Sequence, residues 1–329
     1  MFEEAIESLL TDHCTPAVVR EAEAGGAVQP LHNALVGSGF LELLAAEEHG
    51  GAGASMIEFQ PVVALCGAYA LPLPLAQTLA ARLLTADPAS LPADAMITFA
   101  QGRARRVDGG IECARVPFAM TASHVIARLD DGLVILPLGK ATIEPTGVHA
   151  SLAASLRWGS DAVTLLPSTV AAGDFEALGA VLHAGLLAGA MTRVFDMTLV
   201  YGNERSQFGK SIGKFQAIQH QLALMAEQVA ATSIAAQAAF MSGRRLPSPL
   251  ASAIAKSRAS EAAQEVAAIS HAVHGAIGVT DEFDLQLYTR RLHEWRQAHG
   301  SEDHWNPVIG RALLATDDQI GDFVRSIAA

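Results

Sequence analysis

Residues 201–220 read Tyr-Gly-Asn-Glu-Arg-Ser-Gln-Phe-Gly-Lys-Ser-Ile-Gly-Lys-Phe-Gln-Ala-Ile-Gln-His. This stretch joins two long apolar segments, so it predicts a helical hairpin with a short, glycine-rich link in the C-terminal half. The second helix, expected over about 213–242, has an apolar face made by Ile218, Leu222, Met225 and Val229. The link carries a guanidinium, two ammonium groups, an amide and two phenyl rings. That mixture favours an anionic ligand with a flat aromatic part, and a nucleotide cofactor is the simplest such ligand.

The rest of the chain is read outward from this link. Further helices are expected at about 175–203, 249–273, 284–298 and 303–327. Short strand-like runs between Met96 and Leu138, separated by Asp-Gly turns, indicate a small antiparallel unit. The first 92 residues read as helices broken by Gly and Pro. We therefore predict an α+β, mainly α fold with three parts: an N-terminal helical domain (1–92), a small antiparallel β middle domain (93–172) and a C-terminal four-helix-type bundle (173–329).

The composition indicates a large core and an acidic surface. Half of the 329 residues are hydrophobic and 17% are charged, which excludes a disordered chain. The net charge is 22 − 34 = −12, which argues against nucleic acid or an anionic membrane as the main partner. Cys14, Cys66 and Cys113 have no paired spacing and are expected to be free thiols. No signal peptide and no apolar run of about 18 residues is visible, so we expect a cytoplasmic protein.

Several motifs together resemble the acyl-CoA dehydrogenases, a family of flavoproteins. They are Arg205-Ser-Gln-Phe-Gly209 with Phe215-Gln216, His274-Gly-Ala-Ile-Gly-Val-Thr280, Tyr288-Thr-Arg-Arg291 with Gly300-Ser301, and Glu47-Glu-His-Gly-Gly-Ala-Gly53. The motifs cover essentially the whole chain, and those in the C-terminal half are the more specific. The resemblance implies α,β-dehydrogenation of an acyl-CoA thioester, with FAD bound at a subunit interface. It also implies an electron-transfer flavoprotein as an alternative electron acceptor.

The resemblance also implies roles for particular residues. Arg205 would meet the FAD pyrophosphate with its guanidinium fork, and Phe208 and Phe215 would pack on flavin or adenine rings. The backbone around Gly275 would let the cofactor approach closely. The complete set of FAD contacts implied in this way is Arg205, Gln207, Phe208, Phe215, Gln216, Gly275, Ala276, Ser301 and Asp303.

The chain departs from the family at the position of the catalytic base. The family places a Glu either just before the pair that corresponds to Gly300-Ser301 or on the first bundle helix, about 26 residues before the signature Arg. These positions hold His299 and Gly179 here. Three substitutes are weighed as bases, and each also has a structural explanation: His299 as a hydrogen-bonded filler, Glu176 as a first-turn helix residue and Glu302 as a cap of the last helix. The histidines lack a zinc-type spacing, so no metal site is expected.

The middle domain also lacks the family's Thr-Glu-Pro and Trp-Ile-Thr elements. The chain thus keeps residues for the nucleotide end of FAD and lacks those for the reacting end. It resembles the short subunits of α2β2 acyl-CoA dehydrogenases that act on steroid side-chain thioesters. This implies a partner subunit that supplies the base and an acyl-CoA substrate. Two alternatives stay open: a structural subunit without cofactor contact, and a homomeric dehydrogenase with an unorthodox base.

Overall fold

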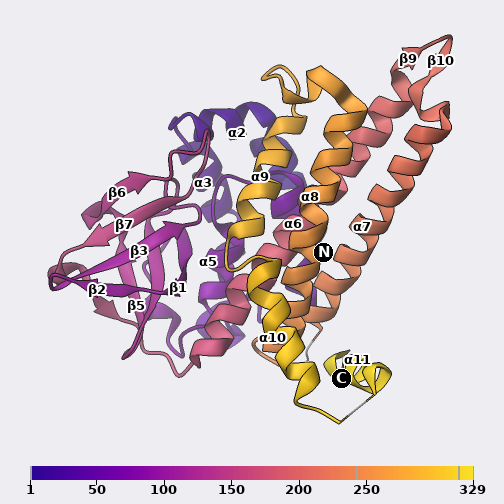
Figure 1. Cartoon of the computed structure of the whole chain (residues 1–329). Helices are drawn as coiled ribbons and strands as arrows, with labels where there is room; N and C mark the ends of the chain where they lie inside the picture. Colours follow the sequence, from indigo (N-terminus) through magenta and orange to yellow (C-terminus); the bar gives the residue numbers. More distant parts are fainter. Residues whose placement is uncertain (1, 242–243, 318, 329) are drawn as a thin grey trace.

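The computed structural model describes residues 2–241, 244–317 and 319–328, which form three consecutive parts (Figure 1). The first part is helical. Its elements are α1 (Phe2–His13), α2 (Pro16–Glu23), α3 (Gln29–Gly37), η1 (Phe40–Glu42), η2 (Glu47–His49), α4 (Met56–Ala68), α5 (Leu75–Ala81) and η3 (Pro88–Ser90).

Local signals explain where two of these helices begin. Ser55 accepts the backbone N–H of Glu58, and the Glu58 carboxylate accepts the N–H of Ser55, which is a capping box at the start of α4. Thr15 accepts from Val18 in the same way at the start of α2, where Pro16 takes the first helical position. These reciprocal bonds satisfy N–H groups that a helix start leaves without partners.

The second part, which we call the β unit, consists of two small sheets that share one core. Its strands are β1 (Ile97–Arg103), β2 (Arg105–Val107), β3 (Gly110–Val116), β4 (His124–Leu129), β5 (Gly132–Pro137), β6 (Thr142–Pro145), β7 (Ala154–Trp158) and β8 (Thr164–Leu165), with η4 (Leu138–Lys140) and η5 (Ser160–Ala162) between them. The sheet orders are β1-β4-β5-β8 and β2-β3-β7-β6. The pairing is antiparallel as predicted, except that β1 and β4 run parallel.

The third part is a bundle in which α6, α7, α8 and α9 pack on one another and α10 packs on α8. Its elements are α6 (Ala172–Glu204), β9 (Ser206–Gln207), β10 (Lys210–Ser211), η6 (Ile212–Lys214), α7 (Gln216–Phe240), α8 (Pro249–His274), η7 (Gly275–Val279), α9 (Leu285–Gln297), α10 (Glu302–Leu314) and α11 (Ile320–Ala328). The fold is mainly α with a small β unit, which confirms the predicted class. The first bundle helix, α6, begins at Ala172 and has Asp174 in its first turn.

Glycines bring α4 and α6 into direct backbone contact. A Cβ on Gly67 would lie 2.0 Å from the carbonyl oxygen of Leu186, and one on Gly189 would lie 1.8 Å from that of Ala64. Both distances are far below any contact that a Cβ adopts, so only glycine fits at either position. The two helices therefore leave no room for an acyl chain between them at these points.

One helix, α6, is long and apolar enough to cross a membrane by length and composition. However, 83% of its most apolar window is buried inside the protein. It has the burial of a core helix, and it carries candidate residues at both of its ends: Glu176 near the start and Arg205 just after the end.

Candidate functional site

The predicted nucleotide contacts of the link lie on an exposed hairpin at the far end of α6 and α7 (Figure 1). Arg205 is the C-cap of α6, and β9 and β10 pair antiparallel beyond it. Phe208 and Gly209 form the turn with positive φ angles of 51° and 80°, and the Phe208 ring is 90% exposed. Phe215 stands edge-on to Phe208 at 6.2 Å between ring centroids, with Lys210 Nζ 4.3 Å above its ring. Gln207 and Gln216 are exposed beside them.

The glycine turn after α8 lies at the same end of the bundle. Tyr201 near the end of α6 stacks on His274 at 4.4 Å, and its hydroxyl donates to the His274 carbonyl at 3.3 Å. Gly275 follows with a φ of 66°, and a Cβ there would meet no atom within 4 Å. Gly275 and Ala276 therefore present exposed backbone at this end of the bundle.

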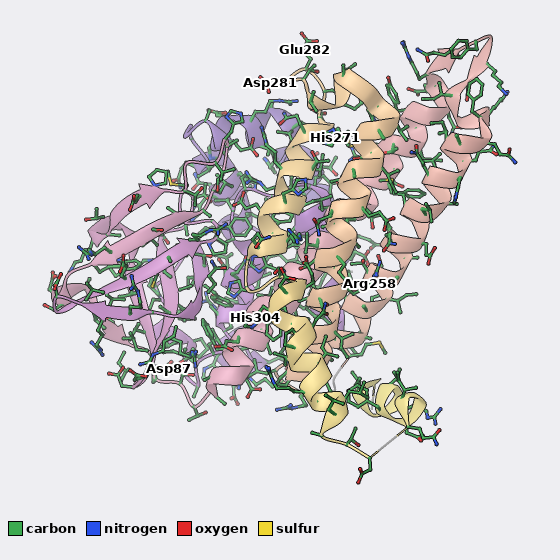
Figure 2. All side chains as sticks on the ribbon, viewed as in Figure 1. Asp87, Arg258, His271, Asp281, Glu282 and His304 are labelled. Carbon is green, nitrogen blue, oxygen red and sulfur yellow. The ribbon has the colours of Figure 1, made fainter. Side chains whose placement is uncertain are left out.

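Ser301 and Asp303 lie elsewhere. Ser301 is the N-cap of α10, and Asp303 is exposed in its first turn. Figure 2 shows the two ends of α9 apart, with Asp281 before its start and His304 beyond its end. Gly179 contacts His299 in the loop before α10. It lies 26 residues before Arg205 along α6, which corresponds to a distance of about 39 Å along the helix axis at 1.5 Å per residue. The structure therefore divides the nine predicted FAD contacts into two groups, too far apart for one extended dinucleotide to touch both within one chain.

The two positions at which the family carries its base face each other. A Cβ on Gly179 would lie 2.2 Å from Nδ1 of His299, so the imidazole occupies the space that glycine leaves open. The His299 ring also packs on His183 at 4.8 Å between centroids. Its backbone N–H donates to Oε1 of Gln101 at 3.0 Å, and its carbonyl accepts from Nε1 of Trp305 at 2.9 Å. We call this arrangement of Gly179, His183 and His299 the imidazole niche.

The imidazole niche holds neutral groups. Burial lowers the pKa of His299 to about 3, helped by Lys256 and opposed by the backbone of Phe99. Burial, with His299, also holds the pKa of His183 well below its usual value. A group with so low a pKa is a weak general base at neutral pH. The Nε2 atoms of both rings are buried without a hydrogen-bond partner.

Lys256 fixes the loop that carries His299. The lysine is fully buried, and its Nζ donates to the carbonyls of Arg296 and Gly300 at 2.8 and 2.7 Å and to Ser260 Oγ at 2.8 Å. Burial lowers the pKa of Lys256 to about 7, with Glu302 opposing and Arg296 adding to the effect. Every donor of the ammonium group therefore has an acceptor, two of which are carbonyls at the end of α9 and in the loop.

The two carboxylates weighed as bases are both engaged. Glu176 accepts from Arg128 at 2.7 Å and lines a cavity of about 310 Å³ together with His299. Glu302 pairs with Arg296. Burial raises the pKa of Glu302, but the hydrogen bonds and charge of Arg296 outweigh it and hold that pKa below its usual value. Of the two, only Glu176 lines the cavity beside His299.

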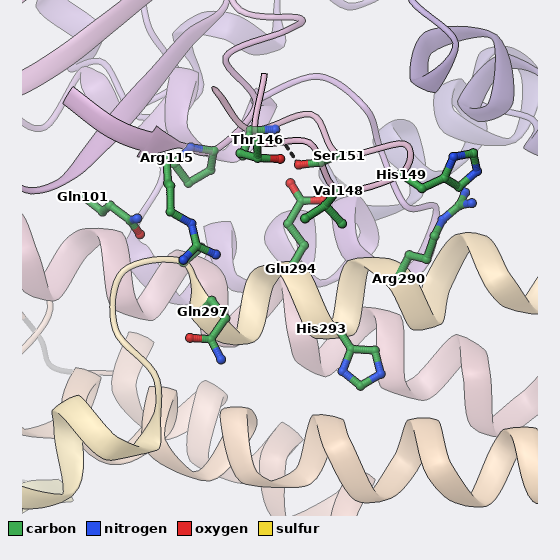
Figure 3. A pocket seen from close by; sticks show the side chains of 13 residues that line it. Gln101, Arg115, Thr146, Val148, His149, Ser151, Arg290, His293, Glu294 and Gln297 are labelled. Atoms are coloured by element: carbon green, nitrogen blue, oxygen red, sulfur yellow. Dashed lines mark hydrogen bonds between the residues drawn. The ribbon is translucent and has the colours of Figure 1, made fainter. Parts of the chain in front are cut away.

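A larger cavity, which we call the α9 cleft, lies between the β unit and α9 (Figure 3). Its volume is about 370 Å³, within the usual range for small-molecule sites. It adjoins the cavity beside His299, since Gln101 and Gln297 line both. Its other polar side chains include Arg115, Thr146, Ser151, His149, His293 and Glu294.

The sequence analysis missed the residues that build the α9 cleft and support the niche. Lys256 could have been noticed as the one charge on the small-residue face of α8, where Ala253, Ala255 and Ala259 are its neighbours. Gln101 and Arg115 lie in strand-like runs and carry no motif. Only the packing of the β unit against α9 reveals them.

Comparison with known proteins identifies the family of the chain. A family model described as the acyl-CoA dehydrogenase C-terminal domain matches residues 173–314. The chain is 32% identical over 307 residues to acyl-CoA dehydrogenase IpdE2 of Mycobacterium tuberculosis, across 89% of this chain and 90% of that protein. The chain belongs to the acyl-CoA dehydrogenase family. FAD is the cofactor that this membership supports, and solved neighbours of the same fold hold FAD or FADH2.

Two heteromeric structures share the fold of this acyl-CoA dehydrogenase family member. The ChsE4–ChsE5 complex from Mycobacterium tuberculosis matches with a TM-score of 0.81 and 21% identity, over 96% of this chain and 97% of that chain. The Tcur3481–Tcur3483 steroid ACAD matches with a TM-score of 0.81 and 23% identity, over 95% and 96%. At this identity the two structures establish the fold alone.

Proposed function

We propose that this chain is one subunit of an FAD-dependent acyl-CoA dehydrogenase that completes an FAD site on a homologous partner, which supplies the catalytic base. One observation carries the proposal. The exposed nucleotide contacts around Arg205 lie about 39 Å along α6 from the base position, which a neutral His299 occupies. Such a chain has the parts to hold a cofactor on another subunit and lacks the parts to use one itself.

The residues at the hairpin fit the nucleotide end of FAD. Among the described residues no carboxylate pairs with Arg205, so its guanidinium fork is free for a phosphate. Phe208 and Phe215 offer ring faces and edges to a flat aromatic group. Gly275 offers backbone that no side chain covers. When bound, FAD supplies the two-electron oxidant, while these residues bind and orient it.

The residues at the imidazole niche do not fit the reacting end. His299 is neutral, buried and held by Gln101 and Trp305. No carboxylate of the described residues takes its place, since Glu176 is paired with Arg128. We therefore assign no proton abstraction to this chain, and the partner supplies it.

Purification of the chain alone and after co-expression with a homologous subunit tests the proposal. We expect bound flavin and dehydrogenase activity only in the co-purified pair, and loss of flavin from the pair with Arg205→Ala. Flavin and turnover by the chain alone would instead support a homomeric enzyme with an unorthodox base. A pair whose flavin content is indifferent to Arg205→Ala, Phe208→Ala and Gln216→Ala together would support a purely structural subunit.

The substrate that we propose is a bulky acyl-CoA thioester of the steroid side-chain kind. The description of a solved neighbour as a steroid ACAD supports the acyl group. The close contact of α4 and α6 leaves no room for an acyl chain between these helices, which supports binding by the partner. The substrate would then be bound largely by the partner. Turnover of a steroid side-chain thioester by the pair, compared with a straight-chain thioester of similar length, checks this assignment. Preference for the straight chain would refute it.

A further inference from the structure

Arg115 has a backbone conformation that the strand does not require. Along β3 the buried side chains are those of Ile111, Cys113 and Val116, so the spacing of inward-facing side chains changes from two residues to three. The register against β7 shifts at the same place, which identifies a β-bulge. Arg115 sits in the bulge with a φ of 49°, a region that a long side chain rarely adopts.

The bulge aims the Arg115 side chain into the α9 cleft. Figure 3 shows its guanidinium extending from the β unit toward Gln297 on α9, with Gln101 beside it. The backbone N–H that the bulge removes from the ladder donates to Oγ of Ser155 at 3.3 Å, so the bulge has its own support. Bulges that redirect a side chain in this way are common beside binding sites, and local strain persists where function requires it.

The charge of Arg115 is not compensated by the cleft itself. Arg290 also lines the cleft, but it pairs with Glu23. The one carboxylate of the lining, Glu294, is held by Arg291 at 2.5 Å. No carboxylate of the described residues pairs with the Arg115 guanidinium, which extends toward the amides of Gln101 and Gln297 (Figure 3).

The other arginines of the β unit show that pairing is the rule there. Arg103, Arg105, Arg106 and Arg128 pair with Asp130, Glu112, Asp131 and Glu176, respectively. Arg157 is the remaining one without an ion pair among the described residues, and it is exposed on β7 and lines none of the cavities described above. Arg115 and Arg157 are thus both exposed and without an ion pair, and Arg115 alone of the two lines the cleft and has a positive φ.

We propose that Arg115 binds an anionic oxygen group, a phosphate or a carboxylate, of a ligand that occupies the α9 cleft of this chain. The planar guanidinium can hold two such oxygens at once, and the amides of Gln101 and Gln297 can bond to the polar edge of the same ligand. The apolar walls of the cleft suit the uncharged part. This binding site is separate from the hairpin that the proposed function assigns to a partner's cofactor. It can therefore be tested independently of the proposed function.

Two probe pairs test the proposal on the purified full chain, alone and with its partner. FMN and riboflavin share the flavin ring and the ribityl chain and differ in one phosphate. Succinyl-CoA and butyryl-CoA share a four-carbon acyl group and the phosphates of CoA, and they differ in one carboxylate. We expect R115Q to weaken the binding of FMN or of succinyl-CoA by about tenfold to a hundredfold. The member of that pair that lacks the added phosphate or carboxylate should change by less than about twofold, within the scatter of weak surface effects.

R115K and R157Q are the matched variants. R115K keeps the charge without the fork and should restore part of the lost affinity, and R157Q should bind like the unchanged protein. The pair that responds identifies the ligand group as phosphate or carboxylate. The proposal is overturned if R115Q weakens the binding of both members of each pair by the same factor, or weakens the binding of none of the four compounds. It is also overturned if the unchanged protein prefers neither FMN to riboflavin nor succinyl-CoA to butyryl-CoA. If the co-purified pair lacks flavin but succinyl-CoA still responds to R115Q, the proposed function fails and this inference survives.

Discussion

A double-mutant cycle at Gly179 and His299 measures the contact that defines the imidazole niche. In an ordinary helix interior, Gly→Ala stabilises by about 1 kcal/mol. At Gly179 the added Cβ would lie 2.2, 2.5 and 2.8 Å from Nδ1, Cε1 and Cγ of His299, so the whole ring must move. The ring has no room to yield, because His183 packs against it and Gln101 and Trp305 hold its backbone.

The expected magnitude follows from these two opposing contributions. Overpacking of this kind costs about 1–3 kcal/mol, so Gly179→Ala should destabilise the protein by up to about 2 kcal/mol when His299 is present. In a His299→Ala background the Cβ enters space that the imidazole has vacated, and the same substitution should stabilise by up to about 1 kcal/mol. The coupling energy between the two positions is then about 1–3 kcal/mol, and the effect of Gly179→Ala changes sign.

Urea unfolding followed by tryptophan fluorescence is the assay, since Trp305 bonds directly to the His299 carbonyl and reports on the niche. Gly173→Ala is the matched control: it lies in the same helix, and a Cβ there meets nothing within 4 Å. It should have the same small effect in both backgrounds. If Gly179→Ala stabilises the unchanged protein, or destabilises it equally with and without His299, the described niche is wrong.

Three further predictions concern the pH dependence of stability, the bulge at Arg115 and the contact between α4 and α6. Burial holds the pKa of His299 near 3, against 6.5 for a free imidazole. Between these pH values the unfolded state binds a proton that the folded state does not, so the free energy of unfolding decreases as the pH falls below 6.5. His299→Gln should reduce the loss between pH 6.5 and 5 by about 2 kcal/mol in urea titrations, and an unchanged pH slope would contradict the cause given. Arg115→Gly should raise the melting temperature, because it relieves a φ of 49°, and a lowered one would argue against strain at the bulge. Gly189→Ala should destabilise by more than about 3 kcal/mol in the same assay, since its Cβ would overlap the Ala64 carbonyl at 1.8 Å, and wild-type stability would disprove the α4–α6 contact.

Periodic and local signals predicted most of the fold. The apolar face of α7 and the Asp-Gly turns of the β unit each depend on residues close in sequence. The signals were weaker for short, exposed strands such as β6, whose four residues are all exposed and so show no alternation. The parallel β1–β4 pair also escaped prediction, because its register depends on which sheet edge is free rather than on any turn.

The candidate site was predictable only where a motif carried it. The hairpin residues from Arg205 to Gln216 lie together in sequence, and the structure keeps them together in space. The niche joins residues 120 positions apart in sequence, Gly179 and His299, and its meaning depends on their contact. Neither a glycine inside a helix nor a histidine in a loop indicates the other. The bulge at Arg115 could not be predicted from sequence for the same reason. Its register depends on β7, some forty residues later, where Ser155 Oγ accepts the backbone N–H of Arg115.

The energetics of the hairpin favour a surface outside this chain that covers the Phe208 ring. Phe208 combines a positive φ with a ring that is 90% exposed, and each feature is unfavourable for an isolated chain. Burying a phenylalanine ring is worth about 1.5–3 kcal/mol, so a ring held in water by a strained turn gives up that energy in the free protein. The strain and the exposure fall on the same residue, beside an arginine that no described carboxylate pairs. Covering the ring with a surface outside this chain would recover its burial energy, which supports the partner subunit proposed above.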